Sequence, residues 1–219
     1  MAKIPTPGRK APAFLGMAAP LIFVFALTLL GFFRKGYDPM AMHVSALSLG
    51  ADGWTQMANF MVFGVLALAS SLGLVLRARE EGRKAAVADI LLMVYSVFLF
   101  FSGPFVMDPM DTPAASMSPH GIVHGLLGGL AFMLMPTICY FDAWYRAKRS
   151  GSKAGTALSL SFALFLSLAL LWFTAISKDA SLHAAFRDYQ GFFQRLVLVP
   201  FMAWLFTRSL LSLRDTSRS

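Results

Sequence analysis

Six apolar runs, each about long enough to cross a lipid bilayer, alternate with short polar segments along the chain. A transmembrane helix needs about 20 consecutive apolar residues, because the hydrocarbon core is roughly 30 Å thick. The pattern therefore predicts an all-α fold and a polytopic membrane protein with six transmembrane helices. The runs cover residues 12–33, 56–76, 86–107, 119–141, 156–177 and 191–212.

Composition supports this interpretation. Hydrophobic residues make up 57% of the 219 residues and charged residues only 14%, whereas a soluble domain carries roughly a quarter charged residues. We expect a single transmembrane domain over residues 12–212, flanked by a cytoplasmic N-terminal tail at 1–11 and a cytoplasmic C-terminal tail at 213–219.

The net charge of +8 is distributed unevenly between the connecting segments. Lys and Arg gather before the first run, between the second and third, between the fourth and fifth, and after the sixth. The positive-inside rule places these segments and both termini in the cytoplasm, as expected for a multi-pass protein of the cell inner membrane. Attraction to anionic lipid head groups accounts for the positive charge, so membrane lipids, and not nucleic acid, are the expected partners.

Polar residues lie toward the ends of the runs. The middle of each run contains no Asp, Glu, Lys, Arg or His, which argues against an ion-coupled transporter or a proton pump. On the cytoplasmic side, Asp89 and Asp142 are expected to pair with neighbouring Lys or Arg in solvent, without a functional role. All the histidines lie on the predicted outer side: His43, His120, His124 and His183.

The segment 108–129 concentrates the residues that can carry chemistry. Ser118 followed by Pro119 predicts the start of a helix, with Ser as the N-cap and Pro at the first helical position. His120 and His124 are four residues apart and therefore share a face of that helix. Small residues one position further round would let another helix approach closely: Gly121, Gly125 and Gly129.

Two interpretations of the histidines stay open. Asp108, His120 and His124 can hold a zinc-like divalent metal, whose acidic bound water would attack an ester or amide, with Ser45 as a further catalytic residue. Alternatively, the histidines bridge helices by hydrogen bonds to Asp108, Ser118 or Gln194. Met residues near His43 and His120 would suit copper, which is a weaker candidate than a zinc-like metal. Haem is disfavoured because no axial pair of His lies deep in the bundle.

A second set of polar residues is expected to bind a ligand beside the histidines. Gln194 and Arg195 lie one turn inside the outer boundary of the sixth run. An Arg in that position usually faces the bundle and pairs with a carboxylate or with carbonyl groups, and Asp108 is the preferred partner. Asn59, at the start of the second run, and His43, in the first outer loop, complete the predicted binding set.

Three groups of residues follow the pattern of a known family. The first comprises Ser45, Leu47, Gly50, Gly53, Trp54, Asn59, Phe60 and Gly64; the second Gly103, Phe105, Asp108, His120 and His124; the third Gln194 and Arg195. Over about residues 15–210 the chain resembles the bacterial membrane family known as domain of unknown function nine-nine-eight. Family members often have Phe-Pro directly before the Asp, whereas here Val106 and Met107 precede it. The resemblance implies six helices and no agreed activity.

A looser analogy exists with membrane hydrolases of the ceramidase type, which place Ser, Asp and three His around zinc but have seven helices and another motif order. Two functions therefore stay open. The sequence favours a membrane module whose outward-facing Asp/His/Arg pocket binds a lipid or a membrane-protein partner. The alternative is a metal-dependent hydrolase that acts on a lipid-like ester or amide at the outer face.

Overall fold

The computed structural model describes residue 8, residues 10–150 and residues 152–216, and within them every regular element is helical. The predicted all-α fold is therefore confirmed. The α-helices are α1 (Ala11–Phe33), α2 (Trp54–Glu80), α3 (Val87–Phe101), α4 (Pro119–Tyr145), α5 (Lys153–Lys178), α6 (Ala180–Ala185) and α7 (Gln190–Thr216). Short turns of other helix types are η1 (Val44–Ser48), η2 (Ala114–Ser116), η3 (Arg146–Ser150) and η4 (Arg187–Tyr189).

Five helices in the described part of the chain are long and apolar enough to cross a membrane, namely α1, α2, α4, α5 and α7. The prediction for the third run was too long, because α3 ends at Phe101 and not at residue 107. Its 15 residues span about 22 Å, less than a typical hydrocarbon core. Pro104 accounts for the earlier end, because the residue before a proline is disfavoured in a helix. Gly103 packs closely against α2, where a Cβ would overlap Met61 and the Met57 carbonyl.

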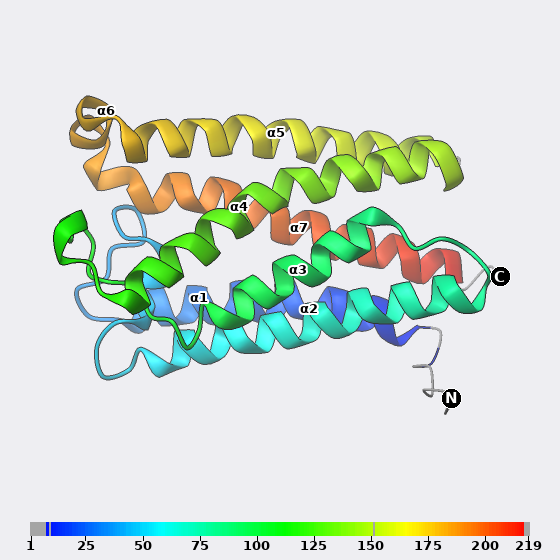
Figure 1. Ribbon diagram of the computed structural model, residues 1–219, viewed down its shortest axis with the longest axis horizontal. Helices are drawn as coiled ribbons and strands as arrows, with labels where there is room; N and C mark the ends of the chain where they lie inside the picture. The colour runs from blue at the N-terminus through cyan, green and yellow to red at the C-terminus, as the bar shows by residue number, and fades with distance from the viewer. Residues whose placement is uncertain (1–7, 9, 151, 217–219) are drawn as a thin grey trace.

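The six longer helices run along the length of the molecule (Figure 1), and the contacts between them close into a ring. Each packs against its neighbours in the chain, from α1 through to α5, and α7 packs against both α5 and α1. The interior of the ring is filled by aromatic side chains that are almost fully buried, including Phe23, Phe63, Tyr95 and Phe201. Large apolar side chains such as Phe25 and Leu168 point outward, at 67% and 69% exposure. An apolar core and an apolar surface together are typical of a multi-pass membrane protein.

The two ends of the ring differ in chemistry. We call one the histidine end, since it carries all four histidines in the loops and helix termini at residues 34–53, 102–124 and 179–195. The other is the arginine end, where the start of α1 meets the ends of α2, α4 and α7 and the start of α3. Of the predicted tails, residues 1–7, 9 and 217–219 lie outside the described residues.

Candidate functional site

A groove of about 740 Å³ opens at the histidine end between α4 and α5, and we call it the histidine-end groove. The two helices diverge toward this end (Figure 1), and the first residues of α7 also line the groove. Five of the residues predicted from sequence line it together: His43, Ser45, Asp108, His124 and Gln194. The other three, His120, Asn59 and Arg195, do not line it.

Gln194 holds the first loop against α7. Its side-chain Oε1 accepts a hydrogen bond of 2.7 Å from the backbone N–H of Val44, the first residue of η1. Both residues are buried, so this bond is made where water does not compete for it. Because η1 follows His43 directly, the bond fixes His43 and Ser45 at the edge of the groove.

Arg195 does not form the predicted pair with Asp108. Its guanidinium donates to the carbonyl oxygens of Pro39 (2.7 Å), Met42 (3.0 Å) and Gly191 (3.0 Å), and to the hydroxyl of Tyr37. The carbonyl groups of the loop are nearer to Arg195 because Gly191 lets the loop backbone pack directly on α7; a Cβ there would overlap the Met42 carbonyl. Arg195 therefore joins the first loop to α7, outside the groove.

Asp108 is instead bound to the start of α4. Its Oδ2 accepts from the backbone N–H of Ser118 (2.9 Å), while the Ser118 hydroxyl accepts from the N–H of Gly121 (3.0 Å). The predicted Ser118 N-cap is thus confirmed. The carboxylate lies in the space where a side chain at position 121 would be, and a negative charge there is favourable at the positive end of the helix dipole.

His120 and His124 both contact Phe105, the first at its ring and the second at its backbone carbonyl. The Nδ1 atom of His124 lies 2.7 Å from the Phe105 carbonyl oxygen, and since a carbonyl only accepts, Nδ1 carries the hydrogen and leaves Nε2 as an acceptor in the neutral ring. His124 is buried, at 8% exposure. His120 is exposed, with its ring centroid 5.5 Å from that of Phe105. The expected hydrogen bonds of the histidines to Asp108, Ser118 or Gln194 are not formed; His124 instead contacts backbone carbonyl groups, including that of Phe105.

The glycine stripe of α4 does not receive another helix, contrary to the prediction. Gly121 packs against Asp108, whereas a Cβ added at Gly125, Gly128 or Gly129 would meet no heavy atom within 4 Å. These three glycines line the groove. Their missing side chains therefore create an open channel along α4, not a close helix–helix contact.

His43 contributes a polar atom without a partner. Its Nε2 atom is buried and makes no hydrogen bond to any described residue, and its ring packs edge-on against Phe173 of α5 at 5.7 Å. Burial, with the positive charges of Arg195 and His183, lowers the pKa of His43 from its usual 6.5 to about 4. At neutral pH the ring is therefore uncharged, and its Nε2 atom can form a hydrogen bond with a ligand in the groove.

Contacts between two segments of the chain form part of the rim of the groove. Asp111 lies within 3.0 Å of the Arg187 guanidinium and 3.5 Å of His183 Nε2. Its φ of +67° places it in the left-handed region, which Asp adopts more readily than most residues. The loop between α3 and α4 is thereby joined to the segment between α5 and α7.

The groove lacks a ready-made metal centre in the described part of the chain, where no three His, Cys, Asp or Glu side chains are grouped to hold an ion. Asp108 and the Nδ1 atom of His124 already have protein partners. Asn59 is buried away from the groove, with its side-chain amide donating to the Phe23 carbonyl of α1 at 3.1 Å.

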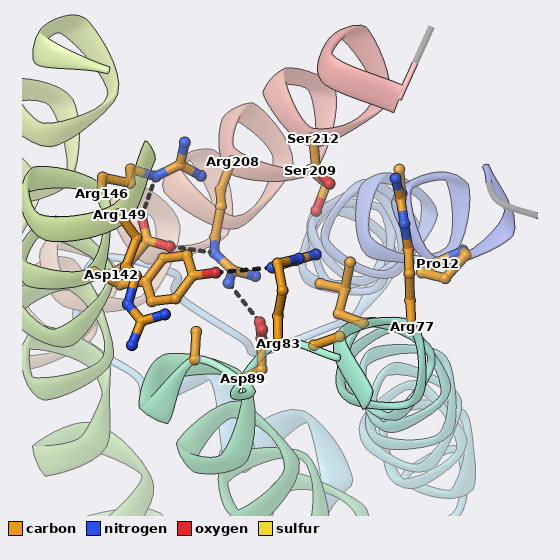
Figure 2. A pocket seen from close by; sticks show the side chains of 15 residues that line it. Pro12, Arg77, Arg83, Asp89, Asp142, Arg146, Arg149, Arg208, Ser209 and Ser212 are labelled. Carbon is orange, nitrogen blue, oxygen red and sulfur yellow. Dashed lines mark hydrogen bonds and ion pairs between the residues drawn. The ribbon is translucent and has the colours of Figure 1, made fainter. Parts of the chain in front are cut away.

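A buried ionic cluster that was not predicted from the sequence lies at the arginine end (Figure 2). Arg208 of α7 donates from Nε to Asp142 of α4 (2.8 Å) and from Nη2 to Asp89 of α3 (2.5 Å). The other carboxylate oxygen of Asp142 accepts from Arg146 (2.6 Å) and Ser159 (2.7 Å). The expectation that both aspartates pair in solvent was therefore wrong, because Asp89 and Asp142 are 7% and 1% exposed.

One signal in the sequence pointed to this cluster. Arg208 lies within the sixth apolar run, about one turn before its predicted end, where an arginine must be paired or reach the interface. The positive-inside pattern accounts for arginines in loops, but not for one inside a run.

Comparison with known proteins identifies the family of this chain. A family model described as "Protein of unknown function (DUF998)" matches residues 17–210. No match was found among curated proteins or among solved structures. The match covers nearly the whole chain and agrees with the resemblance based on the motifs at and before the starts of α2, α4 and α7. This multi-pass membrane protein therefore belongs to the DUF998 family of proteins of unknown function.

Proposed function

We propose that the protein binds a membrane lipid in the histidine-end groove, with the lipid head group at the rim and one acyl chain along α4. The observation that carries the proposal is the groove itself, which combines a polar end with an apolar channel between two diverging helices. Its volume of about 740 Å³ is within the range of small-molecule sites, and holds a head group with the upper part of one chain.

The polar end suits a zwitterionic head group. Two carboxylates, Asp108 and Asp111, and one ammonium group, Lys178, line it together with neutral imidazole and amide groups. A phosphoethanolamine head group can place its ammonium near the carboxylates and its phosphate near Lys178. The unpartnered Nε2 atom of His43 supplies a further hydrogen-bonding group.

The apolar end suits an acyl chain. Below the polar groups, the lining changes to Gly125, Gly129, Phe132 and Met133 of α4 and Phe173 of α5. Met133 is 63% exposed on the side of the bundle, so the channel is open toward the surrounding bilayer. An acyl chain lying there replaces its contacts with bulk lipid by contacts with the protein. The head group then determines which lipid is bound.

The hydrolase alternative stays a prediction. Ser45, Asp108 and His124 do line the groove, but no observation favours a metal or a nucleophile activated by a base.

The orientation is also a proposal. We infer that the histidine end faces outward and that the termini lie in the cytoplasm of a bacterial inner membrane, because Lys and Arg concentrate at the arginine end. Labelling of Lys84 by a membrane-impermeant amine reagent in intact cells would contradict this orientation.

Filling the channel tests lipid binding. Gly125→Leu adds a side chain where a Cβ meets no neighbour, so it should occupy the groove without disturbing the fold. Delipidated protein in detergent is titrated with phosphatidylethanolamine, and bound lipid is counted by native mass spectrometry. We expect saturable binding by the wild type and a loss of about tenfold in affinity, roughly 1.4 kcal/mol, in the variant.

Leu126→Phe is the matched control. Leu126 neighbours Gly125 on α4, is 62% exposed and does not line the groove. The control should bind lipid as the wild type does. Equal lipid binding by wild type, Gly125→Leu and Leu126→Phe would contradict the proposal.

A further inference from the structure

The arginine end contains a second pocket of about 510 Å³, which we call the arginine-end pocket. Figure 2 shows its lining, with the buried ionic cluster at its base. Five arginines from four segments of the chain converge on it: Arg77 of α2, Arg83 of the loop that follows, Arg146 and Arg149 of η3, which follows α4 directly, and Arg208 of α7. Arginines that served only to orient the helices in the membrane would not need to converge on one pocket.

The base of the pocket is electrically balanced. Arg146 and Arg208 carry two positive charges, and Asp89 and Asp142 carry two negative charges in direct contact with them. Arg208 is only 7% exposed, and two of its nitrogen atoms are held by the aspartates. The guanidinium is therefore fixed in position at the base of the pocket.

The rim of the pocket carries a surplus of positive charge. Arg77, Arg83 and Arg149 contribute three positive charges, and Glu81, which contacts both Arg77 and Arg83, contributes one negative charge. The five arginines that line the pocket, together with Asp89, Asp142 and Glu81, which pair with four of them, carry a net charge of +2. A dianion would neutralise this charge.

The donors of the rim have the chemistry of a phosphate site. A guanidinium offers paired N–H groups that match two oxygen atoms of a phosphate, and arginine is enriched where phosphates are bound. Arg83 is held in place by a bond to the Tyr145 hydroxyl at 3.0 Å. Arg149 lies across the pocket from it, on the side of α4 (Figure 2).

One wall of the pocket is apolar. Pro12 and Ala13 of α1 and Leu74 and Ala78 of α2 form it, on the side of the pocket away from Arg146 and Arg149 (Figure 2). A ligand that combines a phosphate with a carbon chain would place its charge against the guanidinium groups and its carbon atoms on this wall.

We propose that the arginine-end pocket is a binding site for a phosphate monoester, either the head group of an anionic lipid or a soluble phosphate ester. The site is separate from the histidine-end groove and its proposed lipid. Its affinity should fall as salt increases, because the rim charges are accessible to solvent.

The test uses two phosphate sources and one pair of variants in the full-length protein. Glycerol 3-phosphate is titrated into detergent-purified protein by calorimetry. In a separate arm, the protein in nanodiscs of phosphatidylcholine is compared with the protein in nanodiscs that also contain phosphatidic acid, by thermal unfolding. Arg149→Gln removes one rim charge, and Lys148→Gln removes the same charge from the adjacent residue, which does not line the pocket.

We expect one or both phosphate probes to bind the wild type, with Arg149→Gln weakening binding about tenfold, as for the loss of one charged hydrogen bond, and Lys148→Gln changing it less than twofold. Binding of glycerol 3-phosphate would show that a soluble phosphate ester is enough to occupy the pocket. A response to phosphatidic acid alone would show that the ligand is a lipid. Absence of both responses would overturn the proposal. So would equal weakening by the two variants, since binding would then depend on overall charge.

Discussion

Individual side chains at the histidine end form hydrogen bonds mainly with backbone groups of the neighbouring loops and helices. Arg195 satisfies three carbonyl oxygens and a hydroxyl, Gln194 satisfies the Val44 N–H, and His124 satisfies the Phe105 carbonyl. Irregular backbone near a bilayer needs such partners, because its polar groups are costly to bury unpaired. His43 differs, since its Nε2 atom has no partner among the described residues.

The pKa of His43 gives the folded protein a pH dependence. The folded state holds the ring neutral down to about pH 4, whereas the unfolded chain takes up a proton near pH 6.5. Between these values the unfolded state binds more protons, so stability falls on acidification, by the order of 1 kcal/mol per pH unit. Below about pH 4 both states are protonated and this contribution stops changing.

His43→Gln removes the group that titrates. Thermal unfolding followed in detergent from pH 7 to pH 4 should show a smaller loss of Tm in His43→Gln than in the wild type. Parallel curves for the two proteins would show that His43 does not produce the acid sensitivity.

At the scale of the element, α4 uses its glycines in two different ways. Gly121 is required because the Asp108 carboxyl group occupies the place of its side chain, and that carboxyl group is fixed by the Ser118 N–H. Gly125 and Gly129 are free of such contacts and leave the groove open. One stripe of small residues thus supports both the start of the helix and the channel beside it.

Alanine substitutions separate the two uses. Gly121→Ala forces a methyl group onto the Asp108 carboxyl group and should destabilise the protein by about 1–3 kcal/mol, the usual cost of overpacking. Gly125→Ala adds a methyl group in open space and should leave stability unchanged or raise it by up to about 1 kcal/mol, because Ala favours helix. Thermal unfolding in one detergent measures both, and similar shifts in the two variants would refute this assignment.

At the scale of the whole molecule, the ring is joined across its interior by the cluster at the arginine end. Arg208 connects α7 to α3 and α4, and Asp142 extends the connection through Ser159 of α5 to the indole N–H of Trp204. Four of the six longer helices are therefore linked by one network. Such a network is sensitive to the loss of any one partner, since the others remain buried.

Asp142→Ala tests the network. It leaves the buried Arg208 and the partly buried Arg146 without their shared carboxylate, and removal of one partner of a buried ion pair costs about 3–5 kcal/mol. The matched control is Asp52→Ala, since the Asp52 side chain is 84% exposed and lies 3.8 Å from Arg34; its loss should cost less than about 1 kcal/mol. Chemical or thermal unfolding compares them, and equal losses would show that the cluster adds no more than a surface pair.

The sequence by itself determined the membrane class, the all-α fold, the long helices and the N-cap of α4. These features depend on local composition, because the transfer of a 20-residue segment from water to lipid is set by the residues of that segment. The end of α3 is local in the same way, because Pro104 follows it closely and the residue before a proline is disfavoured in a helix, so the predicted end at residue 107 was too far along the chain.

Only the tertiary structure decided which polar groups meet. Arg195 was expected to pair with Asp108, but the first loop packs closer to it. Asp89 and Asp142 were expected in solvent, but the closure of the ring brings Arg208 between them. Apolar runs fix how long a helix is, but not its rotation or the helix opposite it. The partner of a buried charge is therefore set by the packing of the ring, and with it the positions of both pockets.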